Sequence, residues 1–122
     1  IMSRIRSRDT RPELAVRNAL RKMGLKYRLH DVRLPGKPDI IVPSMKTAIL
    51  INGCFWHQHS GCRRRAMPKT NREYWENKLH NNVMKQRRDV RALRKLGWKV
   101  HKIWECQTAV KEKLAERLMR VL

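Results

Sequence analysis

The sequence predicts an α/β fold in which a mixed central sheet is flanked by helices, and three observations support this class. The first is the order of periodic segments, which runs helix, three short strands, loop, long helix, strand, helix. The second is that no repeat or interdomain linker interrupts this order. The third is the length of 122 residues, which fits one domain, so we expect a single domain over residues 1–122.

The first helix is expected to begin after Thr10. Thr10 and Glu13 have the spacing of a capping box, in which each side chain accepts a backbone N–H of the first turn. Apolar residues from Leu14 to Met23 then give the helix one apolar face, and Gly24 is typical of the residue that follows a helix end.

Three strands and a long loop are expected next. Residues 26–30 alternate between polar and apolar side chains, and residues 39–42 and 47–51 are apolar runs typical of buried strands. Residues 53–69 then show neither a helical nor a strand period. So long a loop is unusual in a small domain unless something fixes it in place.

The remaining elements are a long helix, a strand and a last helix. Thr70 and Glu73 predict a second capping box, and the helix that follows extends to Leu96 with a break expected near Asn81-Asn82. Gly97 ends this helix. Residues 98–104 alternate strictly and predict a strand whose tryptophans pack in the core, and residues 109–122 form a basic amphipathic helix.

The charge indicates a polyanionic partner. Lys and Arg number 30 against 10 acidic residues, which gives a net charge of +20 and strong self-repulsion in the folded state. Nucleic acid is the expected partner of so basic a domain. A membrane surface would require an amphipathic helix with aromatic residues on its apolar face, whereas the aromatic residues here gather in loops and at helix starts. No apolar run is long enough to cross a membrane, so we expect no membrane partner.

Three cysteines and a histidine form a candidate zinc site. The set is Cys54, His59, Cys62 and Cys106, and three thiolates with one imidazole are a common structural zinc set. A zinc ion there would attach the long loop to the end of the last strand. The alternative is three buried free thiols beside a surface histidine, and His57 competes with His59 as the fourth ligand.

Asp39 and His57 are candidates for catalysis. Asp39 opens a strand after a Pro-Gly-Lys-Pro turn, where its carboxylate could hold a divalent cation that also contacts a phosphate, although turn chemistry alone also explains an aspartate there. His57 could take a proton from an attacking water, or serve as a zinc ligand. Phe55 and Trp56 are adjacent, which favours exposure of at least one, and exposed aromatics of a basic protein can wedge between DNA bases.

Several segments together resemble the very-short-patch-repair mismatch endonucleases. They are Leu34-Pro-Gly-Lys-Pro-Asp39, Asn52-Gly-Cys-Phe-Trp-His57 with His59 and Cys62, Glu73-Tyr-Trp75 with Lys78 and Asn82, and Gly97-Trp98 with Trp104-Glu-Cys106. The likeness extends from about Met2 to Cys106. It implies a type II restriction endonuclease-like fold of the PD-(D/E)xK superfamily, with a structural zinc on Cys54, His59, Cys62 and Cys106 rather than on His57.

The resemblance also implies roles in catalysis and DNA recognition. Asp39 and the backbone carbonyl of Ile51 would bind catalytic magnesium, His57 would be the general base, and Glu13 would be an acid near the site. The residues implied in DNA contact are Phe55, Trp56 and Trp75 as an aromatic wedge, Lys78 and Asn82 as readers of the mismatched pair, and Met2 in the opposite groove.

The activity implied is a nick 5′ to the thymine of a T:G mismatch, which begins repair of deaminated 5-methylcytosine. The expected partner is double-stranded DNA, bound by a monomer at the nucleoid in a bacterial cytoplasm. The family usually has histidine at the position of Asn52 and aspartate at that of Gln86. Asn52 can still bond a phosphate or a metal-bound water, but Gln86 cannot act as a carboxylate, and Asp89 would approach from another direction. These departures support an alternative, a mismatch-binding protein with weak or lost catalysis; a sequence-specific or homing-type nuclease of the same fold is a further one.

Overall fold

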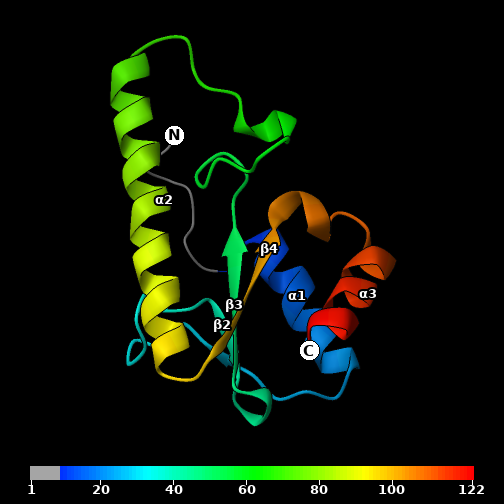
Figure 1. The fold of residues 1–122 in the computed structure, drawn as a ribbon. Coiled ribbons are helices and arrows are strands. Elements are labelled where there is room, and N and C mark those ends of the chain that lie inside the picture. Colours follow the sequence, from blue (N-terminus) through cyan, green and yellow to red (C-terminus); the bar gives the residue numbers. More distant parts are fainter. Residues whose placement is uncertain (1–8) are drawn as a thin grey trace.

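The computed structural model describes residues 9–122, which form a four-stranded sheet with helices on both of its faces (Figure 1). The elements are α1 (Arg11–Lys22), β1 (Arg28–Leu29), β2 (Ile40–Val42), β3 (Thr47–Asn52), α2 (Arg72–Lys95), β4 (Lys99–Trp104) and α3 (Lys111–Val121). Met2, expected in a DNA groove, lies outside the described residues.

The sheet is mixed, as the sequence predicts. Its strand order is β1-β2-β3-β4, in which β1, β2 and β3 pair antiparallel and β3 and β4 pair parallel. The parallel pair needs a crossover connection, and the long loop with α2 supplies it. Consequently the ends of β3 and β4 lie at the same edge of the sheet, where Asn52 is paired with Trp104.

Two apolar layers hold the helices to the sheet. Helices α1 and α3 cover one face and α2 covers the other (Figure 1). Because side chains alternate along a strand, Ile40 and Val42 join the core under α1 and α3, whereas Ile41 joins the core under α2. Within the described residues, no helix is both long and apolar enough to cross a membrane.

One of the two hydrogen bonds of the predicted capping box is present at the start of α1. Thr10 Oγ1 accepts the N–H of Glu13 at 3.3 Å, as expected. The carboxylate of Glu13 reaches past Thr10 and accepts the N–H of Asp9 at 3.1 Å. Glu13 is thereby drawn inward and is only 2% exposed.

Two predictions about α2 are wrong. Its N-cap is Asn71, in the left-handed region with φ of 54°, and no side chain caps the helix there. The helix also continues without a break through Asn81-Asn82. Helix propensity is a weak prior that tertiary contacts override, and here Leu79 is buried beside the Asn pair and the Asn82 amide bonds the Trp56 carbonyl at 3.4 Å.

Candidate active site and metal centre

Asp39 stands immediately before β2 and completes the sheet there with its side chain. Its Oδ2 accepts the N–H of Ile51 at 2.7 Å, beyond the last backbone pair between β2 and β3. Burial raises the pKa of Asp39 to about 6, while the Ile51 N–H and the nearby His30 act in the opposite direction. Asp39 also lines a cavity together with Ile51, Asn52 and His57, so this carboxylate is buried but faces an open space.

His57 faces the same cavity from the loop after β3. A turn closed by the His57 N–H on the Gly53 carbonyl, at 3.1 Å, presents it there. Burial, with a smaller contribution from Lys102, lowers the pKa of His57. The imidazole is therefore neutral at pH 7, which is the form that can accept a proton.

Asn52 and Gln86 join β3 to α2 through two reciprocal amide bonds. The Asn52 Nδ2 donates to Gln86 Oε1 at 2.9 Å, and Gln86 Nε2 donates to Asn52 Oδ1 at 2.8 Å. Asn52 is 1% exposed, so each amide supplies the partner that the other needs in the interior. Asp89 pairs instead with Lys85 at 2.8 Å, one turn further along α2.

Glu13 lies beside Asp39 and brings with it a residue that the sequence interpretation missed. Glu13 Oε1 is 3.0 Å from His30 Nε2, and ligand atoms of Glu13, His30 and Asp39 all lie within 4.8 Å of one another. His30 follows β1, and its N–H donates to the Asp39 carbonyl at 3.0 Å. The sequence carries no direct signal for His30, because the antiparallel pairing of β1 with β2 is what brings it opposite Asp39.

Three aromatic rings form a cluster beside this site, and two of them, Phe55 and Trp56, line a cavity together with Asp39 and His57. The ring centroid of Phe55 lies 5.2 Å from that of Trp56 and 5.6 Å from that of Trp75, and the two tryptophans are 5.8 Å apart. All three are half-buried. Phe55 and Trp56 therefore lie together rather than facing opposite ways, because they belong to the tight turn after β3 and not to the strand.

The other residues predicted to contact DNA lie on α2 near these rings. Asn82 is tied to the Trp56 carbonyl, and it lines the cavity that contains Asp39 and His57. Lys78 is exposed, one helical turn from both Trp75 and Asn82. Asn82 thus lies at the cavity, and the helical spacing places Lys78 on the same side of α2 as Trp75 and Asn82.

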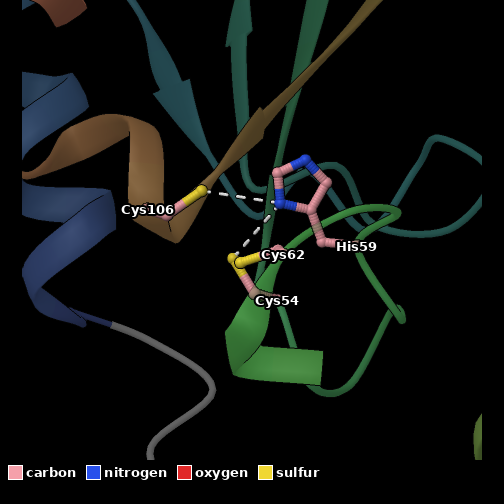
Figure 2. Close-up of side chains that lie close together, drawn as sticks. All are labelled: Cys54, His59, Cys62 and Cys106. Atoms are coloured by element: carbon pink, nitrogen blue, oxygen red, sulfur yellow. Dashed lines mark hydrogen bonds between the residues drawn. The ribbon is translucent and has the colours of Figure 1, made fainter. Parts of the chain in front are cut away.

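The three cysteines and His59 converge on one point (Figure 2). His59 Nδ1 is 3.6 Å from Cys54 Sγ and 3.5 Å from Cys106 Sγ, and the four ligand atoms lie within 4.8 Å of one another. Zinc–sulfur and zinc–nitrogen bonds of about 2.3 and 2.05 Å at a tetrahedral angle separate sulfur and nitrogen by about 3.6 Å. The donors and their spacing therefore suit a tetrahedral zinc ion, and His59, not His57, belongs to this set.

The Trp104-Glu105-Cys106 segment attaches the loop to the sheet through three different contacts. The Trp104 ring stacks on the His59 ring, with centroids 4.1 Å apart and planes inclined by 7°. Glu105 Oε1 accepts the Cys54 N–H at 3.0 Å, and Cys106 completes the cysteine cluster. Trp104 thus packs against the loop and not in the core, because the strand ends at this point.

Comparison with known proteins identifies relatives over the whole chain. The family described as DNA mismatch endonuclease Vsr matches residues 1–64. A type II nicking enzyme, V.XorIIP of Xanthomonas oryzae pv. oryzae, is 41% identical over 122 residues, which are 100% of this chain and 89% of that protein. V.NmeAIP of Neisseria meningitidis, also a type II nicking enzyme, is 39% identical over 100% of this chain and 86% of its own length.

A third relative carries the name of the family itself. The DNA mismatch endonuclease Vsr of Escherichia coli is 39% identical over 118 residues, or 97% of this chain and 75% of that protein. The mixed sheet with helices on both faces is the restriction endonuclease-like class that the sequence predicts. On these grounds the chain is an endonuclease that belongs to the Vsr family of DNA mismatch endonucleases.

Proposed function

We propose that this protein is a magnesium-dependent endonuclease that nicks one DNA strand 5′ to the thymine of a T:G mismatch. The observation that carries the proposal is the cavity shared by Asp39, Ile51 and His57, which opens beside the aromatic cluster of Phe55, Trp56 and Trp75. A buried carboxylate, a backbone carbonyl and a neutral imidazole suit phosphodiester hydrolysis, and the aromatic rings suit entry into a weakened base step.

Asp39 and Ile51 are the proposed magnesium ligands. The N–H and C=O of one strand residue point to the same edge, so the Ile51 carbonyl faces the side on which its N–H meets Asp39. Two oxygens of this kind suit magnesium, which keeps several waters in its shell. Bound there, the ion would neutralise charge on the scissile phosphate and lower the pKa of a bound water.

His57 is the proposed general base. Its lowered pKa keeps the imidazole ready to take a proton from the attacking water. Asn52, held by Gln86, would donate a remaining amide hydrogen to a phosphate oxygen or to a metal-bound water. Glu13 would add negative charge beside Asp39 and favour cation binding.

The cysteine cluster is the proposed structural zinc site. Its donors are those that zinc prefers, and the 3.5 and 3.6 Å separations support tetrahedral coordination. Zinc there would fix the loop that carries Phe55, Trp56 and His57. Its role would therefore be to hold catalytic and DNA-contacting residues in place.

DNA recognition is proposed to combine the aromatic wedge with polar readers on α2. Phe55, Trp56 and Trp75 would insert beside the mismatch, while Lys78 and Asn82 would contact the mismatched pair and Met2 the opposite groove. Since one nick needs one active site, a single chain suffices, and we propose a monomer that acts on the nucleoid DNA of a bacterial cell. The name of the E. coli relative supports a mismatch as the substrate.

A nicking assay on labelled duplexes tests the proposal. A T:G duplex incubated with protein and magnesium should yield one nicked strand 5′ to the thymine, whereas the matched duplex should stay intact. Asp39→Ala should abolish the nick, and Glu116→Ala, at an exposed acid on α3, should retain it. Absence of a nick with every divalent cation would contradict the proposal.

Lost or weak catalysis is the second candidate, and the Asn52–Gln86 pair favours it. Asn52 and Gln86 bond each other as two neutral amides, and neither can ionise like the histidine and aspartate that the family usually has at these positions. Tight, magnesium-independent binding to the T:G duplex without a nick would support this candidate. Asn52→His combined with Gln86→Asp should then gain activity.

A third candidate is a nuclease of the same fold that cuts at another target. The relatives named type II nicking enzymes support this candidate, because their names do not mention a mismatch. A panel of matched duplexes and of all mismatches in several sequence contexts decides between the three.

A further inference from the structure

Glu13 is a buried acid in which one carboxylate oxygen accepts two hydrogen bonds and the other points toward His30. Its side chain is 2% exposed, and Oε2 accepts both the Asp9 N–H at 3.1 Å and the Arg17 guanidinium at 3.3 Å. Oε1 faces His30 Nε2 at 3.0 Å. The two donors to Oε2 hold the carboxylate in one orientation, so Oε1 is presented in a fixed direction.

His30 is held just as firmly, by its backbone. Its N–H donates to the Asp39 carbonyl at 3.0 Å, and its φ is 47°, in the left-handed region that few side chains other than Asn, Asp and His adopt. The side chain is 16% exposed. This backbone turn directs the imidazole toward Glu13, on the side of β2 where Asp39 lies.

The three side chains have the spacing of cation ligands. In an octahedral shell with bonds of about 2.1 Å, neighbouring ligand atoms are about 3.0 Å apart and opposite ones about 4.2 Å apart. The Glu13–His30 separation is 3.0 Å, and all three ligand atoms lie within 4.8 Å of one another. An ion pair between Glu13 and His30 alone would account for the 3.0 Å contact, whereas a cation would also engage Asp39, whose ligand atom lies within the same 4.8 Å.

We propose that Glu13, His30 and Asp39 together hold a divalent cation with an imidazole nitrogen in its shell, and that this site binds manganese more tightly than magnesium. Magnesium takes oxygen ligands and seldom a nitrogen, whereas transition-metal ions accept imidazole readily. The proposal rests on the role of Asp39 as a cation ligand proposed above, and adds to it which ion the site prefers.

Manganese is the probe, because its unpaired electrons report directly on a bound nitrogen. Protein prepared with zinc present throughout, so that the cysteine cluster is filled, is titrated with Mn²⁺ and Mg²⁺, and electron spin echo modulation is recorded on bound Mn²⁺. The wild-type protein should bind Mn²⁺ at least tenfold more tightly than Mg²⁺ and should show ¹⁴N coupling from one imidazole.

His30→Asn is the test variant, since Asn tolerates a positive φ and keeps the backbone bond to Asp39. It should lose the ¹⁴N coupling and weaken Mn²⁺ binding about tenfold or more, while Mg²⁺ binding changes less than twofold. His57→Gln, which removes the imidazole that lines the cavity beside Glu13 and Asp39, should keep the ¹⁴N coupling. Thermal unfolding checks that both variants are folded.

The inference and the proposed function fail separately. Absence of ¹⁴N coupling in the wild-type protein overturns the inference even if His30→Asn does not fold, and so does coupling that persists in folded His30→Asn or disappears in His57→Gln. Absence of Mn²⁺ binding, or equal affinity for the two ions, overturns it as well. Nicking of T:G duplex with magnesium, measured on the same preparation, decides the proposed function independently.

Discussion

Asp39→Asn is expected to stabilise the magnesium-free protein at neutral pH, although it removes the proposed cation ligand. Burial raises the pKa of Asp39 from its ordinary value of 3.8 to about 6. Between these values the folded protein holds a proton that the unfolded chain releases. The stability contributed by protonated Asp39 is therefore complete below pH 3.8 and is lost as the pH rises toward 6.

The size of the effect follows from the shift. A pKa shift of about two units corresponds to about 3 kcal/mol in the free energy of unfolding. Asp39→Asn should gain this full amount over the wild type near pH 8 and about half of it at pH 5. Asn has nearly the same shape, and its Oδ1 can still accept the Ile51 N–H. The substitution therefore removes the buried charge and changes little else.

Urea unfolding from pH 5 to pH 8 measures the difference between the two proteins. The buffer contains no magnesium and no chelator, so that the cysteine cluster keeps any bound metal. Glu116→Gln removes an exposed acid on α3 and is the control, which should change the free energy of unfolding little. A stability difference for Asp39→Asn that is constant across this pH range, or that has the opposite sign at pH 8, would refute the reasoning.

Three further changes test other parts of the structure. Cys62→Ser removes one of four candidate zinc ligands and should reduce bound zinc, measured by elemental analysis, to less than a tenth of an equivalent per chain. Gln86→Ala leaves the buried Asn52 amide without its partner and should lower the free energy of unfolding by about 1–3 kcal/mol in urea titration. Gly36→Ala brings a Cβ to 2.8 Å from the Asp89 side chain at a φ of 75°, and it should lower the free energy of unfolding by about 1–3 kcal/mol.

Each of these changes has a matched control. His57→Gln should leave the zinc content at one equivalent, because His57 is outside the cysteine cluster. Asn81→Ala removes an exposed amide on the same helix as Gln86 and should change stability little. Gly24→Ala carries the same backbone strain, with a φ of 76° and no atom within 4 Å of the added Cβ, so it should cost less than Gly36→Ala. Equal losses in a variant and its control would contradict the contact in question.

The fold was predictable because its strands and helices differ in apolar periodicity. Residues 39–42 and 47–51 read as buried strands and are β2 and most of β3, since both faces of the sheet are covered by helices. The start of α2 was not predictable in the same way. The capping-box spacing of Thr70 and Glu73 was present, but the chain begins the helix at Arg72, after Asn71.

The parts of the candidate site that lie close together in the sequence were predictable. The parts that come together only through the pairing of strands were less so. Spacing alone left His57 and His59 as rival zinc ligands, and their separation became clear only when the turn after Gly53 placed them on different sides of the loop. His30 gave no signal of its own, because its position beside Glu13 follows from the pairing of β1 with β2. The zinc, the magnesium and the roles of the individual residues stay predictions.

The attachment of the loop by Trp104, Glu105 and Cys106 has a consequence for synthesis of the chain on the ribosome. Cys54 and Cys62 emerge first, and residues 63–105 must follow before Cys106 can reach them. At about 5–20 residues per second, the two earlier thiols wait for a few seconds with an incomplete ligand set. Thiols in that interval are open to oxidation or to capture of another soft metal ion. The yield of protein that holds the proposed zinc ion should therefore depend on the cell's supply of reductant and zinc during translation.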